Sequence, residues 1–200
     1  MGISTSNHSI PLLLPLLATL LYSSAASRPF AVKPTTTEFI RRSCGATTYP
    51  RLCFASLYTH AGLIQTSPML LADTALTVAF QTAQSAAAAV LRMSGTHGMR
   101  ASEAAAVRDC VEEVGDSIDE LRESLVEMKK LKGSNFEAVM SDVQTWVSAA
   151  LTDDDTCTDG FAGKAMDGNV KAAVRGHILN IAHLTSNALA LINQYASLHG

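Results

Sequence analysis

The acidic run at residues 153–155 is the first feature of this sequence that suggests chemistry, because clustered carboxylates can bind Ca²⁺. Three positions of a calcium-binding EF-hand loop are matched, by Asp155, Asp159 and Gly160. Positions 3 and 12 of that loop would be Cys157 and Met166, which do not supply the hard oxygen ligands that Ca²⁺ requires. We therefore expect no metal here and interpret the run as an ordinary solvent-exposed helix end.

The usual catalytic motifs are absent from the sequence. It contains no G-x-S-x-G, H-E-x-x-H or P-loop pattern. His177 and His183 lie six residues apart, which on a helix separates them by about 120° and makes a poor metal-binding pair. We expect no catalytic residues, no metal and no cofactor, and we interpret both histidines as packing or surface residues.

The N-terminal residues have the pattern of an export signal. Residues 10–22 (IPLLLPLLATLLY) form an apolar run of the length of a signal-peptide core, too short to be a membrane anchor. Ser24 and Ala26 fit a small-x-small cleavage site, so we expect a signal peptide at residues 1–26. No second apolar run of sufficient length follows. The mature protein is therefore expected to be secreted, without a membrane span.

Four cysteines lie in the expected mature chain, at Cys44, Cys53, Cys110 and Cys157. In an oxidising compartment an even number of cysteines predicts disulfides. Three pairings can be drawn. The eight residues between Cys44 and Cys53 make a local bridge easy, which favours Cys44–Cys53 together with Cys110–Cys157. A zinc site is the alternative, but the sequence has no C-x-x-C and no histidine at ligand spacing.

The elements that would position these residues are expected to be helices, because the chain is rich in alanine, 48% hydrophobic and only 6% aromatic. Apolar residues recur at helical spacing in four segments. The first runs from Ser67-Pro68 to Gly95, the second ends at Gly133, the third opens with a capping box from Ser134 to Glu137, and the fourth starts near Asp167.

The second and third segments have clear apolar seams. The second segment places seven residues at alternating steps of four and three, at Val107, Val111, Val114, Ile118, Leu121, Leu125 and Met128. The third is expected to bury Phe136, Met140, Val143, Val147 and Ala150. Four amphipathic helices with short connections predict an all-α fold, an antiparallel up-down-up-down four-helix bundle at residues 67–200. A helical hairpin at residues 34–62 would precede it, bent at Tyr49-Pro50, and residues 27–200 would form one domain.

Charge is distributed unevenly along the chain, although the formal net charge is only −3. The pI of about 6.0 gives no basic field, so we do not expect a nucleic-acid binder. Sixteen of the 18 acidic residues lie between positions 103 and 167. Four of them form a stripe about 150° from the apolar seam of the second segment, at Glu112, Asp116, Asp119 and Glu123. The stripe should face solvent, where it serves either solubility or the docking of a protein partner.

Several runs around the four cysteines and near the C-terminus form a familiar pattern. They are residues 39–44 (FIRRSC) with 48–53 (TYPRLC), 106–110 (AVRDC) with 116–121 (DSIDEL), 145–151 (TWVSAAL) with 155–161 (DTCTDGF), and 184–191 (LTSNALAL). Together these runs resemble the plant invertase and pectin methylesterase inhibitor family. The runs cover essentially the whole expected mature chain. Four cysteines in register make the resemblance specific.

The resemblance implies a secreted four-helix bundle with an N-terminal hairpin and the same two disulfides. It also implies a protein that is no enzyme itself, and that binds an extracellular carbohydrate-modifying enzyme and blocks its substrate cleft. The runs TWVSAALT and DTCTDGF look like the pectin methylesterase inhibitor branch. Invertase inhibitors often carry Pro-Lys-Phe where this chain has Gly163-Lys164-Ala165. We therefore expect a stoichiometric inhibitor of plant pectin methylesterase in the cell wall, with invertase inhibition as the alternative.

The resemblance also implies which residues meet the enzyme. Acids on the second bundle helix and polar residues beside the last cysteine correspond to Glu112, Asp116, Asp119, Thr156 and Asp159. One departure from the family pattern is Val114, where the family usually has tyrosine. Because no catalytic domain follows Gly200, we expect a free-standing inhibitor rather than the pro-region of an esterase.

Two alternatives from other classes of protein stay open. One is a small secreted bundle that carries an apolar ligand, against which the alanine-dense core argues. The other is an unrecognised hydrolase, which the release of methanol from pectin would reveal.

Overall fold

The structure, a computed structural model, describes residues 1–2, 35–95, 98–162 and 168–199. Every regular element in these residues is helical, which confirms the all-α fold class. The expected signal peptide at residues 1–26 lies outside the described residues except for Met1 and Gly2. Gly163-Lys164-Ala165 also lies outside them. None of the helices within the described ranges is long and apolar enough to cross a membrane.

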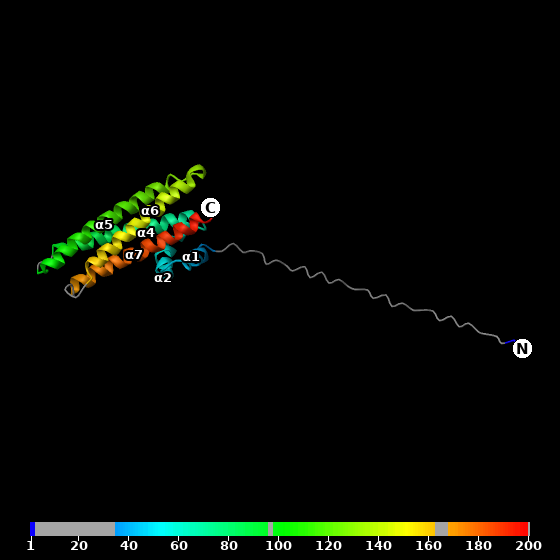
Figure 1. The fold of residues 1–200 in the computed structure, drawn as a ribbon, viewed down its shortest axis with the longest axis horizontal. Helices are drawn as coiled ribbons and strands as arrows, with labels where there is room; N and C mark the ends of the chain where they lie inside the picture. Colours follow the sequence, from blue (N-terminus) through cyan, green and yellow to red (C-terminus); the bar gives the residue numbers. More distant parts are fainter. Residues whose placement is uncertain (3–34, 96–97, 163–167, 200) are drawn as a thin grey trace. The chain divides into compact units, whose positions relative to one another are not determined.

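Four long helices form an antiparallel bundle (Figure 1). They are α4 (Pro68–Ser94), α5 (Ala101–Met128), α6 (Phe136–Gly160) and α7 (Asn169–Ala196). Helix α4 packs mainly against α5 and α7, and α6 packs against the same two helices. Consecutive helices run in opposite directions (Figure 1), which is the topology expected for helices joined by short connections.

The start of α4 follows its sequence signals. The hydroxyl oxygen of Ser67 accepts a hydrogen bond from the backbone N–H of Leu70 at 3.3 Å, and Pro68 is the first residue of the helix. Serine at the N-cap satisfies a free backbone donor, and proline at the next position has no donor to satisfy. The predicted start of the first bundle helix is therefore confirmed.

The start of α6 differs from the prediction, and the expected capping box between Ser134 and Glu137 is wrong. A short 3-10 helix, η2 (Gly133–Asn135), precedes α6. The side-chain oxygen of Asn135 accepts a hydrogen bond from the backbone N–H of Lys132 at 2.7 Å. This bond closes the turn before α6, so Ser134 lies inside η2 instead of capping α6.

Helix α5 buries a slightly different line of residues from the predicted one. Four of the seven predicted positions are buried, at Val107, Val114, Leu121 and Met128. The three between them, Val111, Ile118 and Leu125, are only half-buried. Their places in the interior are taken by residues one position earlier, Cys110, Ser117 and Ser124. Small side chains at these positions let α5 lie close to its neighbours. The Ser124 hydroxyl donates a hydrogen bond to the Glu120 carbonyl at 2.9 Å, so the burial of Ser124 leaves no unpaired donor.

Helix α6 follows its predicted seam more closely. Met140, Val143, Val147 and Ala150 are buried, whereas Phe136 at the start of the helix is only half-buried. The Phe136 ring instead makes an edge contact with the ring of Tyr195 of α7, with the centroids 5.5 Å apart.

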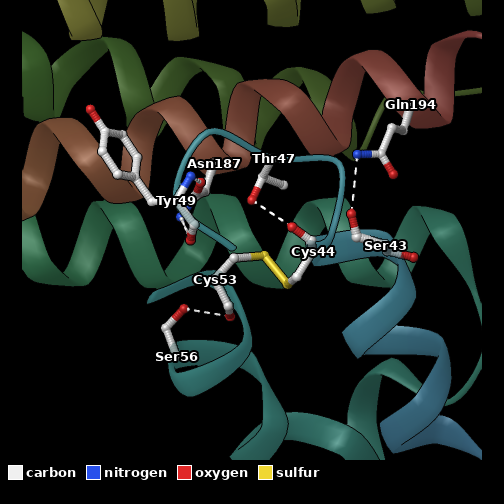
Figure 2. Close-up of a disulfide and its surroundings, with 8 residues drawn as sticks. All are labelled: Ser43, Cys44, Thr47, Tyr49, Cys53, Ser56, Asn187 and Gln194. Carbon is white, nitrogen blue, oxygen red and sulfur yellow. Dashed lines mark hydrogen bonds between the residues drawn. A yellow bond between two sulfur atoms is a disulfide. The ribbon is translucent and has the colours of Figure 1, made fainter. Parts of the chain in front are cut away.

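The predicted hairpin consists of α1 (Thr36–Cys44) and α2 (Pro50–Leu57), followed by η1 (Tyr58–His60) and α3 (Ala61–Ile64). The Cys44–Cys53 disulfide joins α1 to α2 beside the bend at Tyr49-Pro50 (Figure 2). Apolar residues of the hairpin meet α4 and α7 in a second core cluster, which includes Ile40, Leu57, Ile64, Leu71 and Leu191.

Asn187 of α7 fastens the bend of the hairpin to the bundle. Its side-chain oxygen accepts a hydrogen bond from the Tyr49 backbone N–H at 3.0 Å, and its side-chain nitrogen donates to the Tyr49 carbonyl at 3.1 Å. Figure 2 shows this amide against the backbone of Tyr49. The Tyr49 ring stacks on that of His183, with the centroids 3.7 Å apart. The hairpin is therefore held by directed polar contacts as well as by apolar packing.

Candidate protein-binding face

The acidic stripe of α5 lies on the exposed side of the helix. Glu112, Asp116, Asp119 and Glu123 are all exposed. Asp119 forms an ion pair with Arg122 one turn later, and the Arg122 guanidinium also lies 5.9 Å from the centroid of the Phe80 ring. The charge of Asp119 is thus partly matched within the protein.

The two candidate residues on α6 lie at its C-terminal end. Thr156 and Asp159 are both exposed. The Thr156 hydroxyl donates to the Thr152 carbonyl at 2.8 Å, so its proton is used within α6 while its oxygen can still accept a hydrogen bond. This end of α6 therefore offers acceptors and negative charge to a partner.

The Cys110–Cys157 disulfide brings the two sets of residues together. It joins α5 to α6 with the two Cα atoms 4.5 Å apart. Beside it is a hollow with a volume of about 490 Å³, and Glu112, Thr156 and Asp159 line it. Asp116 and Asp119 do not line the hollow, because they lie further along α5. The structure thus places three of the five candidate residues around one concavity and the other two on the ridge that continues from it.

Two further acids line this hollow, and the resemblance did not point to them. They are Asp109 and Glu113 of α5. Asp109 lies seven residues before Asp116 and Glu113 lies three residues before it, so both are near the same side of the helix as Asp116. Extending the stripe by one turn toward the N-terminus would have found Asp109. We call the hollow together with the stripe the acidic face, made by Asp109, Glu112, Glu113, Asp116, Asp119, Glu123, Thr156 and Asp159.

Glu113 is the acid of this face whose ionisation the surroundings oppose. Its partial burial is the largest cause that raises the pKa of its carboxyl group, and the neighbouring carboxylates raise it further. These neighbours are Asp153, Asp116, Glu112 and Asp109. A cationic group placed in the hollow would relieve this repulsion.

Two more acids lie beneath the acidic face, Glu120 of α5 and Asp153 of α6. Each has one buried oxygen without a hydrogen-bond donor, Oε2 of Glu120 and Oδ2 of Asp153. Burial and the neighbouring Asp153 raise the pKa of Glu120 to about 8, and burial raises that of Asp153 as well. Burial thus favours the neutral form of both carboxyl groups.

The interpretation of residues 153–155 as a solvent-exposed helix end is wrong for Asp154. Helix α6 continues to Gly160, and Asp154 is fully buried. Counting four residues on from Ala150, the last residue of the predicted seam, leads to Asp154, and three more lead to Cys157. The interpretation rested on the charge of residues 153–155. The position of each residue around the helix axis determines which of the three points inward.

Within the described ranges, no group of three or more histidine, cysteine, aspartate or glutamate side chains is placed to hold a metal ion. Asp155 and Asp159 belong to a regular helical stretch of α6 instead of a calcium-binding loop. The arrangement can offer a charged, partly concave surface to another protein.

Val114 stands at the position where the family that the sequence resembles usually has tyrosine. Val114 is fully buried in the main core of the bundle. Its side chain packs beneath the stripe, and the exposed acids Glu112 and Asp116 lie on either side of it in the sequence.

The structure defines a disulfide-linked four-helix bundle that carries an exposed acidic face. Comparison with known proteins agrees with this fold. Residues 38–191 match the model of the family described as plant invertase/pectin methylesterase inhibitor. The chain is 49% identical over 165 residues to a 21 kDa protein of Daucus carota, covering 81% of this chain and 86% of that protein. It is 48% identical over 183 residues to pectinesterase inhibitor 11 of Arabidopsis thaliana, covering 90% and 91% of the two chains.

A solved structure shares the fold. The crystal structure of a mutant form of a pectin methylesterase inhibitor from Arabidopsis matches with a TM-score of 0.62 and 24% sequence identity, covering 75% of this chain and 92% of that one. The chain belongs to the plant invertase/pectin methylesterase inhibitor family.

Proposed function

We propose that this protein is an inhibitor of plant pectin methylesterase, which it binds stoichiometrically so as to cover the pectin-binding cleft. The observation that carries the proposal is the 48% identity to a pectinesterase inhibitor over nine-tenths of both chains. Relatives at 46% and 39% identity are also named pectinesterase inhibitors. The protein is then an enzyme inhibitor that regulates the de-esterification of pectin in the cell wall.

The acidic face is the part of the molecule that we assign to the enzyme. Removal of methyl esters from pectin exposes carboxylates, so the cleft that holds the product has to accommodate negative charge. Glu112, Asp116 and Asp159 present the same charge on a rigid pair of helices. A partner surface of opposite potential would be attracted to this face and oriented by it. Inhibition then needs no chemistry from the inhibitor, because the bound bundle occupies the space of the substrate.

Thr156 and Asp119 have different expected roles in this contact. The Thr156 oxygen accepts a hydrogen bond at the rim of the hollow. Asp119 already has Arg122 as a partner, so it gains less from a cation of the enzyme. Asp116 forms no ion pair of this kind with any of the described residues, so we expect it to contribute more than Asp119.

Residues 1–26 are proposed as a signal peptide, so that the inhibitor domain at residues 27–200 acts outside the cell. The two disulfides support this location, because such bonds persist in oxidising compartments. Within the domain we assign residues 34–62 to the hairpin and 67–200 to the bundle.

A paired assay tests the target. The disulfide-bonded protein is titrated against a plant pectin methylesterase, followed by methanol release, and against a plant acid invertase, followed by glucose release. We expect esterase activity to fall linearly and to end at one equivalent of inhibitor, with invertase activity unchanged. Loss of invertase activity alone would assign the chain to the other branch of the family, and methanol release by the chain itself would make it a hydrolase.

A further inference from the structure

Asp154 lies in the interior where three bundle helices meet. Its side chain has no exposed surface, and neither do those of Ser117 and Thr185. The Ser117 hydroxyl, from α5, lies 3.0 Å from Oδ1 of Asp154, and the Thr185 hydroxyl, from α7, lies 3.3 Å from Oδ2. A single titratable group of α6 thus connects α5 to α7 through the core.

The charged groups that act on Asp154 are other carboxyl groups. Asp153 and Asp155 flank it on α6, and both oppose its ionisation. Helix α5 adds Glu120, whose own ionisation Asp154 opposes in turn, and α7 adds the uncharged Thr185. Two hydroxyl donors are little compensation for a charge that is removed from water and repelled by its neighbours.

We propose that Asp154 is a positioning residue that holds α5 and α7 against α6 in its neutral form and loosens the bundle when it ionises. In the neutral form one carboxyl oxygen carries a proton and donates it to a hydroxyl oxygen. That hydroxyl can donate to a backbone carbonyl of its own helix, as serine and threonine often do. Every buried donor then has an acceptor. After ionisation a charge stays in the core without a cation.

The direction of the pH effect follows from the two states of the protein. Burial is the main cause that raises the pKa of Asp154 from 3.8 to about 7 in the folded protein. Between these two values the folded protein binds more protons than the unfolded chain, so stability falls as pH rises through this window. The stabilising contribution of neutral Asp154 to the free energy of unfolding is fully present below the lower of the two pKa values. It is lost above the upper one. The folded bundle is therefore favoured by acid.

Thermal unfolding of the disulfide-bonded protein tests whether neutral Asp154 stabilises the bundle. The melting temperature is measured at about pH 4.5 and at about pH 8 by the fluorescence of Trp146, the single tryptophan, and by far-UV circular dichroism. We expect the melting temperature of the wild-type protein to fall by several degrees between the two pH values. Asp154→Asn, which mimics the neutral acid, should make this fall clearly smaller, and the part that remains belongs to Glu120 and Asp153, whose pKa values burial also raises. Glu137→Gln, an exposed acid in the first turn of α6 that does not act on Asp154, should leave it unchanged.

A structural role without titration would give a different result. In that case Asp154→Asn would change the melting temperature by the same amount at both pH values, and the proposal would be overturned.

A second measurement needs no variant at Asp154. The carboxyl carbon signals of the wild-type protein are followed by NMR as a function of pH, and the signal of Asp154 should titrate about two or more pH units above the ordinary value. Thr185→Val removes a donor to the charged form, so the midpoint of this signal should move to a still higher pH. A midpoint close to the ordinary value would contradict the proposal.

Discussion

The carboxyl groups of α5 and α6 fall into two sets according to their access to water. Glu112, Asp116 and Asp159 are exposed, so a partner can reach them. Asp154 is fully buried and its neighbour Asp153 is half-buried, and burial raises the pKa of both. We therefore assign the exposed acids to the proposed contact with the enzyme and buried Asp154 to the proposed proton binding inside the helix pair.

Asp116 and Asp119 test the role of the exposed set. The double change Asp116→Asn and Asp119→Asn should raise the inhibition constant for pectin methylesterase about five- to thirtyfold, because each charge contributes roughly 0.5–1 kcal/mol to attraction of a basic partner. Asp116→Asn alone should have the larger effect, because Arg122 already neutralises part of the charge of Asp119. Methanol release measures the inhibition constant.

The matched control for this pair is Glu137→Gln. Glu137 is an exposed acid in the first turn of α6, at the opposite end of the helix from Thr156. Circular dichroism should show the same helicity for all variants. Unchanged inhibition by the double variant would exclude these acids from the contact.

At the scale of elements, the amphipathic periods predicted α4 to α7 well, because apolar spacing and the Ser67-Pro68 signal are local properties. The inward positions Ser117 and Ser124 could not be predicted in this way, since serine counts as polar in any hydropathy pattern. Their burial depends on how closely α5 lies to its neighbours. Asp154 was misjudged for the same reason, although continuing the seam of α6 by four residues reaches it.

The hollow of the acidic face could be predicted only in part. The charges of Glu112 and Asp116 are visible in the sequence, and the resemblance adds Thr156 and Asp159. Their placement around one concavity depends on the crossing of α5 and α6 at the Cys110–Cys157 bond, which is a tertiary contact. Local sequence patterns carry no information about such a crossing.

The two disulfides should have separable effects. Replacing Cys110 and Cys157 by serine opens a link between residues 47 positions apart, which should lower the free energy of unfolding by about 4 kcal/mol. It should also weaken inhibition, because the bond holds α5 and α6 together beside the hollow. Urea unfolding and methanol release measure the two effects.

The matched control is the replacement of Cys44 and Cys53 by serine. This bond closes a separation of only nine residues, so its loss should cost less than about 3 kcal/mol and leave inhibition largely intact. Equal losses of inhibition in the two double variants would contradict a role for the hollow.

Asn187 should be the residue on which the docking of the hairpin most depends. Asn187→Ala removes both hydrogen bonds to the Tyr49 backbone and should lower the free energy of unfolding by about 2 kcal/mol. Ser186→Ala, which loses only a 3.3 Å contact with the Thr48 hydroxyl, should cost less than about 0.5 kcal/mol. The measurement is urea unfolding followed by Trp146 fluorescence. Equal costs for the two variants would show that Asn187 has no special part in the attachment.

At the scale of the whole molecule, the net charge of −3 conceals an uneven distribution of charge. The hairpin carries basic residues, of which Arg41 pairs with Glu38 at 3.3 Å and lies 4.8 Å from the centroid of the Phe54 ring. The acids are concentrated on α5 and α6. A positively charged partner will therefore be attracted to the side of the bundle formed by α5 and α6 more than to the other sides.

Carboxyl footprinting of the complex tests the central claim most directly. The inhibitor is labelled at its carboxyl groups with a carbodiimide and an amine, alone and with one equivalent of pectin methylesterase, and the labelled residues are identified by mass spectrometry. We predict that Glu112, Asp116 and Asp159 become protected in the complex, whereas the exposed acids Glu38 and Glu137 are labelled as before. Protection of Glu38 or Glu137 with unchanged labelling of the acidic face would contradict the account.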